Sequence, residues 1–174
     1  MPNHVKNVLK FKHLTPDDVD TIVNMIAIES EDEPSSYWID FDKIIPEPRE
    51  ESECPFDCKV NSESHISADP GRPWYDWYRW RNKYWGTKWG AYDCYSKVGK
   101  SYVTFVFSTA WSMPYPVIER LHLMGYEFEL RYADEDWGSN CGILMYSREQ
   151  GFTHFGEDNL TNPDQWARRL WNNY

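Results

Sequence analysis

The chain opens on an alternation of apolar and lysine-rich positions. Residues 5–11 follow this two-residue period, which is typical of a strand with one buried face and one exposed face, here largely lysine. Thr15, Pro16 and Asp18 then supply a capping hydroxyl, a proline at the first helical position and an acid at the third. Apolar residues follow at helical spacing. We therefore predict a strand over 5–11 and a helix that runs to about Glu29.

The next stretch has no clear period. Residues 30–72 are rich in acids, prolines and serines, which indicates either a functional loop or a partly disordered one. Pro73 then opens a predicted short helix that Gly86 would end. At 3.6-residue spacing, one face of this helix would carry Trp74, Trp77, Tyr78, Arg81, Tyr84 and Trp85.

The second half of the chain is a regular series of strands and helices. A predicted helix begins at Pro116 and ends at Gly125, and Asn162 caps a predicted C-terminal helix that carries Trp166, Leu170 and Trp171. The predicted strands, recognised by their β-forming residues or alternating pattern, cover 91–97, 101–109, 127–132 and 142–148.

This order of elements indicates an α+β fold. The first six regular elements form a βαββαβ unit, which is typical of a ferredoxin-like antiparallel sheet with helices on one face. We expect a single domain over 1–174, with a long insertion at about 30–90 after the first helix. An extra strand and helix would follow the unit at the C-terminus.

Composition agrees with a globular chain. Its 174 residues are enough to bury roughly 70% of the surface of the unfolded chain. The ten tryptophans and a mean hydropathy of −0.75 place the apolar surface in a few large rings. There is no run of the ~20 apolar residues that a membrane span needs and no signal-peptide pattern. We therefore expect a soluble cytoplasmic protein without a membrane partner, and the sequence carries no signal for a particular oligomeric state.

Negative charge is concentrated in one region. The net charge is −10, which argues against a protein that binds nucleic acid directly through its phosphates. Residues 17–57 hold 14 of the 28 acids and, as bases, only Lys43 and Arg49. Regional acidity of this kind can be a recognition surface for a basic partner. We expect the acidic surface to comprise Glu29, Glu31, Asp32, Glu33, Glu47, Glu50, Glu51 and Glu53.

Several segments resemble a known family. MPNHVKN at 1–7, FDKIIPEP at 41–48, WGTKWGAYD at 85–93, TAWSMP at 109–114 and YADEDWGSNCG at 132–142 are similar to the YubB-like family. These are small proteins of phages and plasmids with a ferredoxin-like domain of uncharacterised function. The resemblance implies that fold and a mobile-element origin, and it carries over no catalytic residue and no cofactor.

Two of these segments are candidate binding sites. In the first, glycines and rings surround polar groups that would anchor a partner, although the same tryptophans could instead fill the core. In the second, carboxylates follow a strand end, where they could bind a cation, act as acid and base, or form a solvated turn. The candidate binding residues of these two segments are Trp85, Thr87, Lys88, Trp89, Tyr92, Asp93, Asp134, Glu135, Asp136 and Asn140, and Trp111 of the 109–114 segment joins them.

The cysteines allow a weak zinc hypothesis. Cys54 and Cys58 form one close pair, which Cys94, Cys141 or His65 could complete, but a second close pair is absent. Unliganded reduced thiols are the alternative that we expect. We therefore predict no metal, no cofactor and no catalytic residue.

Three functions follow from these residues. The leading hypothesis is a phage or plasmid accessory protein that binds the basic surface of a host protein, as an inhibitor of host defence or of nucleic-acid handling. The second is a metal-assisted hydrolase that uses 134–136 with Lys88 or His154. The third is a single-strand nucleic-acid binder that uses the interleaved rings and arginines of 74–81, whose alternative role is packing on the sheet.

Overall fold

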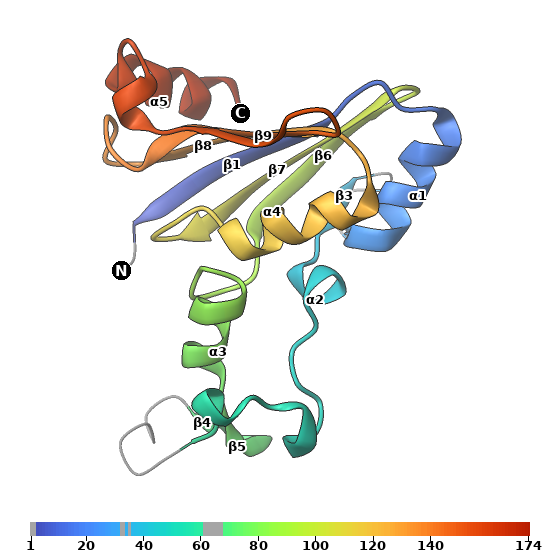
Figure 1. Ribbon diagram of the computed structural model, residues 1–174, viewed down its shortest axis with the longest axis vertical. Helices are drawn as coiled ribbons and strands as arrows, with labels where there is room; N and C mark the ends of the chain where they lie inside the picture. Colours follow the sequence, from blue (N-terminus) through green and yellow to red (C-terminus); the bar gives the residue numbers. More distant parts are fainter. Residues whose placement is uncertain (1–2, 32–33, 35, 61–67) are drawn as a thin grey trace.

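The centre of the molecule is an antiparallel sheet. The computed structural model describes residues 3–31, 34, 36–60 and 68–174 (Figure 1). Within them, six strands pair in the order β10-β9-β8-β1-β7-β6. Their bounds are β1 His4–Phe11, β6 Tyr92–Gly99, β7 Tyr102–Ala110, β8 Phe128–Asp134, β9 Cys141–Ser147 and β10 Gly151–Phe155.

The predicted ferredoxin-like unit is present. Helix α1 (Pro16–Ile26) connects β1 to β6, and α4 (Tyr115–Leu121) connects β7 to β8. Both helices cover the same face of the sheet in Figure 1. Strand β7 lies between β1 and β6, and β8 pairs with the other edge of β1. The sequence did not predict β10, which extends the sheet beyond β9. The largest side chains buried on this side include Phe11, Phe41, Phe105, Phe107, Ile22, Ile118 and Leu130.

Local signals fix the start of α1, and tertiary pairing fixes its end. The hydroxyl of Thr15 accepts the backbone N–H of Asp18, whose carboxylate accepts the N–H of Thr15. The helix ends three residues before the predicted Glu29, because Ala27–Glu29 form strand β2 and pair with β3 (Tyr37–Ile39). In this extended conformation the side chain of Ala27 is buried.

The helix predicted from Pro73 begins later. Residues Arg72–Asp76 form strand β5, which pairs with β4 (Ala68–Asp69), and helix α3 covers Trp77–Tyr84. The start of α3 is set by Asp76, whose carboxylate accepts the N–H of Arg79. Proline fits the extended strand because its fixed φ is also that of extended backbone. Trp74 therefore does not lie on the helical face predicted for it.

Residues 45–60 and 68–84 form a group of short elements at one side of the sheet (Figure 1). We call this group the lobe. It follows α2 (Phe41–Ile44) and contains short 3-10 turns at Glu51–Glu53 and Phe56–Cys58. An ion-pair network lies inside it: the carboxylate of Glu47 pairs with the guanidinium groups of Arg72 and Arg81. The lobe thus holds its short elements together with charge as well as with rings.

Helix α5 (Pro163–Asn173) lies on the opposite face of the sheet from α1 and α4 (Figure 1). Its N-terminus is capped as predicted, because Asn162 accepts the N–H of Gln165. The indole N–H of Trp171 donates to the carbonyls of Ala133 and Asp134. The second core that α5 closes comprises Val8, Val106, Ala133, Cys141, Ala167 and Leu170.

This second core corrects one expectation about β1. Val8 belongs to the face that we expected to be exposed and lysine-rich, yet it is buried beneath α5. An alternating pattern shows which residues share a face of the strand, but it does not show which elements will cover each face. Among the helices of the described residues, none has the length and apolar character to cross a membrane.

Candidate functional site

Three loops meet at one end of the sheet. The start of β1 lies beside the ends of β7 and β8, since His4 is opposite Ala110 and Val5 is opposite Asp134. The start of β6 lies at the same end, because Tyr92 pairs with Ser108 near the end of β7. We call this region the sheet-end surface and define it as Asn3, His4, Lys88, Trp89, Tyr92, Asp93, Trp111, Glu135, Asp136 and Asn140.

Asp134 holds the loop after β8 in place. Its buried carboxylate accepts the side-chain N–H groups of Asn3 at 3.2 Å and Asn140 at 3.0 Å. It also accepts the backbone N–H of Asp136 at 3.0 Å. Three donors satisfy the charged group, which is the condition for burying it. The prediction that Asp134 contacts a partner is therefore wrong, because its carboxylate is enclosed.

The other two acids of this turn point to different groups. A carboxylate oxygen of Glu135 accepts the backbone N–H of His4 at 2.9 Å, and Asp136 accepts the side-chain N–H of Asn3 at 2.6 Å. Both residues are exposed. In the described parts of the chain, no three His, Cys, Asp or Glu side chains are grouped so that they could hold a metal ion. The turn presents negative charge at the surface, but its carboxylates do not converge on one point.

The box at 85–93 divides into an interior part and an exposed part. Trp85 is buried, and its indole N–H donates to the carbonyl of Ile45 at 2.9 Å. Thr87 is also buried; its hydroxyl donates to the carbonyl of Ala110 at 2.8 Å and accepts the N–H of Ala110. The prediction of binding roles for Trp85 and Thr87 is therefore wrong, because both side chains fasten this box to the rest of the fold.

The exposed part is built around a cation and several rings. The ammonium of Lys88 lies 4.8 Å from the ring centroid of Trp89 and 5.4 Å from that of Trp111. Trp111 keeps 42% of its surface exposed and contacts the ring of Tyr78 edge to face. An ammonium within about 6 Å of an indole ring is attracted to its face, so Lys88 links the two rings. Lys88, Trp89 and Trp111 therefore form one cation–ring cluster at the surface.

Tyr92 joins this patch to the start of β1. Its hydroxyl lies 2.7 Å from Nδ1 of His4, and its ring packs edge to face on both His4 and Trp89. Burial raises the pKa of Tyr92 to about 12, with smaller contributions from the negative charges of Asp93 and Glu135. The phenol therefore keeps its proton at neutral pH and acts as a hydrogen-bonding group.

Backbone strain is concentrated at the same end. Of the non-glycine residues with positive φ in the described chain, Trp111 (70°), Trp137 (27°) and Asn140 (46°) lie in its loops, Asp93 (49°) lies at the start of β6 where the register with β7 shifts, and His13 lies elsewhere. Each such residue costs on the order of 1–3 kcal/mol, and such residues cluster at ligand sites and switch regions. The strain is evidence for a functional constraint on these loops.

The acidic segment does not form the continuous surface that we expected. Glu47 is only 5% exposed and pairs with Arg72 and Arg81 inside the lobe, so its assignment to the surface is wrong. The physical reason is that two guanidinium groups offset the cost of burying the carboxylate.

The remaining acids of the segment have mixed roles. Glu51 pairs with Lys59 at 3.2 Å, and Glu53 accepts the backbone N–H groups of Arg49 and Glu50. These carboxylates thus have local partners. The exposed acids of the prediction are Glu29, Glu31, Glu50, Glu51 and Glu53, whereas Asp32 and Glu33 lie outside the described residues.

The 74–81 segment uses its cations within the lobe. Arg81 pairs with Glu47, and Arg79 donates to the backbone carbonyl of Asp57. Tyr75 and Trp80 are buried. The arginines and the buried rings of this segment therefore pack the lobe, whereas the alternative interpretation placed the segment on the sheet.

The candidate zinc ligands are not assembled in the described part of the chain. Cys54 and Cys58 are buried thiols, and burial raises the pKa of Cys58 to about 12. Cys94 and Cys141 lie in β6 and β9. His65 lies outside the described residues. His154, which the hydrolase hypothesis paired with residues 134–136, has a different partner, since its Nε2 lies 2.8 Å from the hydroxyl of Tyr132.

Sequence reasoning missed two members of the sheet-end surface and one neighbour. Asn3 precedes β1 and His4 is its first residue, and Trp137 lies in the loop after β8 with its ring 4.1 Å from the guanidinium of Arg168. The available signal was topological. In the predicted βαββαβ unit the start of the first strand must lie beside the ends of the third and fourth, so the residues before it belong with those loops.

One comparison with known proteins found a match in the second half of the chain. Residues 86–165 match the family model of the ferredoxin-like domain in Api92-like protein. The match runs from the end of α3 through β10 to the first turn of α5, which is just under half of the chain. No curated protein and no solved structure gave a match. The ferredoxin-like fold seen in the sheet thus has independent support.

The matched residues contain most of the sheet-end surface. All its members lie within 86–165 except Asn3 and His4, which β1 brings to it by pairing with β7 and β8. The lobe and α1 lie outside the match. The candidate surface therefore lies mainly within the matched residues.

Proposed function

We propose that this protein works by binding a second protein through the sheet-end surface. The observation that carries the proposal is the exposed ring of Trp111, held by Lys88 beside carboxylates that have neutral partners. Glu135 and Asp136 accept hydrogen bonds from amide groups, and in the described chain no lysine or arginine pairs with either. Their negative charge is therefore available to a partner.

The chemistry of this surface fits a basic partner. Large rings are the residues that most often anchor a protein interface, and tryptophan and tyrosine dominate such anchors. Asp93, Glu135 and Asp136 outnumber Lys88, so the surface is negative as a whole. Complementary charge speeds encounter and excludes wrong partners. The expected partner presents lysines or arginines around a hollow that accepts an indole ring.

The resemblance to the YubB-like family suggests where such a partner would be found. Proteins of phages and plasmids act inside a host cell, so we propose a cytoplasmic host protein with a basic surface. A protein of host defence or of nucleic-acid handling has such a surface. Occupying that surface would make the chain an accessory inhibitor, which requires no catalytic residue.

A capture experiment with matched variants tests the proposal. The immobilised protein is exposed to host extract at low and at high salt, and bound proteins are quantified by mass spectrometry. We expect Trp111→Ala and Glu135→Gln each to reduce the captured partner at least about tenfold, because each removes an anchor or a charge. High salt should have the same effect as Glu135→Gln.

Two control variants test whether the effect depends on the position of the removed group and not only on its chemical kind. Phe56 is 92% exposed in the lobe, and Glu149 is exposed in the turn between β9 and β10. Phe56→Ala and Glu149→Gln remove the same kinds of group elsewhere, so both should capture the partner normally. If Trp111→Ala and Glu135→Gln capture the same proteins in the same amounts as the wild type, the sheet-end surface is not the binding site.

A further inference from the structure

The sheet has a second surface with the opposite charge. Strand register and side-chain alternation place one set of side chains on the α5 side of the sheet. In Figure 1, α5 lies over the β8–β9 side at the end of β1 that carries the N-terminus, and the rest of this face has no helix above it. We call the uncovered part the open sheet face and define it as Lys10, Lys12, Lys97, Tyr102, Glu127, Glu129, Arg131 and Met145.

This face is basic in an acidic protein. Four of its residues are cations and two are acids, although the whole chain has a net charge of −10. Glu129 lies between Lys12 at 3.3 Å and Arg131 at 2.6 Å. Burial alone would raise the pKa of Glu129, but Arg131 and Lys12 lower it overall, so the carboxylate stays ionised. Lys10 and Lys97 make no ion pair among the described residues.

The cations of this face alternate with rings. The ammonium of Lys10 lies 5.3 Å from the ring centroid of Tyr102, and that of Lys97 lies 5.0 Å from the ring of Tyr174 at the end of α5. Arg131 lies 5.4 Å from the ring of Trp166, also in α5. Three of the four cations are thus beside an aromatic ring, and the array extends across β6, β7, β1 and β8.

Tyr102 is the most exposed ring of the array. It is 40% exposed and lies at the start of β7, with its ring over Gly99. Any side chain at Gly99 would overlap this ring, so the glycine is what permits its position. The ring is therefore presented by a tight turn.

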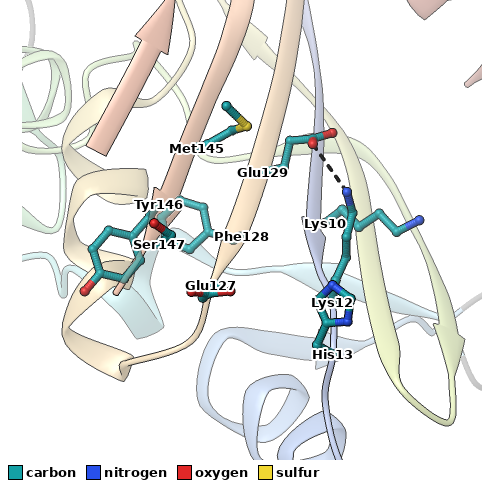
Figure 2. A pocket seen from close by; sticks show the side chains of 9 residues that line it. All are labelled: Lys10, Lys12, His13, Glu127, Phe128, Glu129, Met145, Tyr146 and Ser147. Carbon is teal, nitrogen blue, oxygen red and sulfur yellow. Dashed lines mark hydrogen bonds and ion pairs between the residues drawn. The ribbon is translucent and has the colours of Figure 1, made fainter. Parts of the chain in front are cut away.

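A hollow of about 180 Å³ opens beside Lys10 and Lys12, between β1, β8 and β9. Figure 2 shows Lys12 reaching across it to Glu129, with Met145 beside them, while Lys10 points away from Glu129. The exposed His13 lies at its rim. The open sheet face thus combines free ammonium groups, a presented ring and a partly apolar hollow.

We infer that the open sheet face binds single-stranded nucleic acid. Single strands are held by cations that follow the phosphates and by rings on which successive bases stack, and four-stranded sheets of βαββαβ type use their open face in this way. An acidic peptide would pair with Lys10 and Lys97 but would leave the ring of Tyr102 without a role. This inference is independent of the proposed protein partner, because the two surfaces share no residue.

The net charge sets the expected strength of binding. A chain of charge −10 repels a polyanion at long range, so binding should be detectable at low salt and fall steeply as salt is added. Contact of about three phosphates with Lys10, Lys12 and Lys97 predicts that log K falls against log salt with a slope of about −2. The same repulsion explains why the composition alone argues against nucleic-acid binding.

Fluorescence anisotropy with the whole protein and a labelled oligothymidylate tests this inference. At ~50 mM salt we expect saturable binding, which Lys10→Gln and Lys97→Gln each weaken several-fold. Tyr102→Leu should weaken it about tenfold without a change of charge, whereas Tyr102→Phe keeps the ring and should bind normally. Lys59→Gln, which removes one positive charge in the lobe, serves as the matched control and should bind as the wild type does.

Three outcomes would overturn the inference. One is the absence of binding to the oligothymidylate at low salt. Another is equal binding by Tyr102→Leu and the wild type, which would leave the ring without a part in recognition. The third is competition by poly-glutamate as effective as that by unlabelled oligothymidylate, which would make the face a general anion site. Circular dichroism of each variant shows that altered binding does not reflect unfolding.

Discussion

The lobe and the sheet-end surface contain the same kinds of residue and use them in opposite ways. In the lobe, Glu47 is 5% exposed between two arginines, and Tyr75 is fully buried. At the sheet-end surface, Trp111 is 42% exposed, and Glu135 faces solvent with only an amide partner. Rings and charges stabilise the interior in one region and are displayed in the other, and composition does not distinguish the two.

Topology explains the difference. The lobe contains a short hairpin, a helix of eight residues and 3-10 turns, so it has little regular backbone to bury and depends on ion pairs and rings. The loops of the sheet-end surface each leave a strand that is paired within the six-stranded sheet. That sheet can maintain strained residues such as Trp111 and Asn140, whose φ angles are 70° and 46°.

Two buried thiols report on the two regions separately. Burial raises the pKa of Cys58 in the lobe to about 12 and that of Cys141, beside the loop after β8, to about 11. Because the thiolate is the reactive form and both sulfurs are buried, labelling by a disulfide reagent at pH 8 should be at least about a hundredfold slower at Cys58 and at Cys141 than in the unfolded chain. Mass spectrometry of timed samples measures both rates.

The same shifts predict a loss of stability at alkaline pH. Thiols of the unfolded chain ionise near pH 9, whereas the native thiols stay protonated, so the free energy of unfolding should fall as pH rises from about 9 towards 12.

Rapid labelling of Cys58 in the native protein at pH 8 would show that the lobe opens readily and would contradict its description as a packed region.

The next largest effect is expected at Glu47. Glu47→Gln keeps the shape of the side chain but leaves Arg72 and Arg81 without its charge, which should lower the free energy of unfolding by about 3 kcal/mol. Urea unfolding measures this change. The loss should be local: labelling of Cys58 should accelerate, whereas that of Cys141 should not.

A matched variant tests whether burial is the cause. Glu149→Gln removes one carboxylate from an exposed turn and should change stability by less than about 0.5 kcal/mol. If both variants have equal stability, the buried network of the lobe contributes nothing and the contrast between the two regions is lost.

Asp134 is the corresponding residue of the sheet-end region. Asp134→Ala leaves N–H groups of Asn3, Asn140 and Asp136 without their acceptor, so we expect a loss of about 2 kcal/mol. Labelling of Cys141 should accelerate and that of Cys58 should stay unchanged, the reverse of the pattern for Glu47→Gln. Glu135→Gln is the control, since that exposed side chain should cost less than about 0.5 kcal/mol.

Local sequence signals predicted the ferredoxin-like unit because each acts over a few residues. Thr15 and Asp18 cap α1, and Gly125 ends the turn after α4 with a φ of 75°. The errors arose where two local signals competed or where a residue is buried by a segment that is distant in the sequence. Pro73 and Asp76 each resemble a helix start, and only pairing with β4 shows that Pro73 lies in a strand. Val8 is buried by α5, which is distant in the sequence.

The candidate site could be predicted only in part, for a related reason. Lys88, Trp89 and Tyr92 were found because rings, glycines and charges occur close together in the chain. Their neighbour Trp85 has the same surroundings in the sequence but lies inside, where its indole N–H bonds to the carbonyl of Ile45. His4 was missed because its relation to Tyr92 depends on the order of strands.

The smallest predicted effect concerns one hydroxyl in each region. The hydroxyl of Tyr75 in the lobe is buried with no hydrogen-bond partner among the described residues, whereas that of Tyr92 is bonded to His4. Tyr75→Phe removes a desolvated group and should stabilise the protein by up to about 1 kcal/mol, while Tyr92→Phe should destabilise it by about the same amount. Thermal unfolding of the two variants compares them directly. Destabilisation by Tyr75→Phe would show that its hydroxyl has a partner in the folded protein.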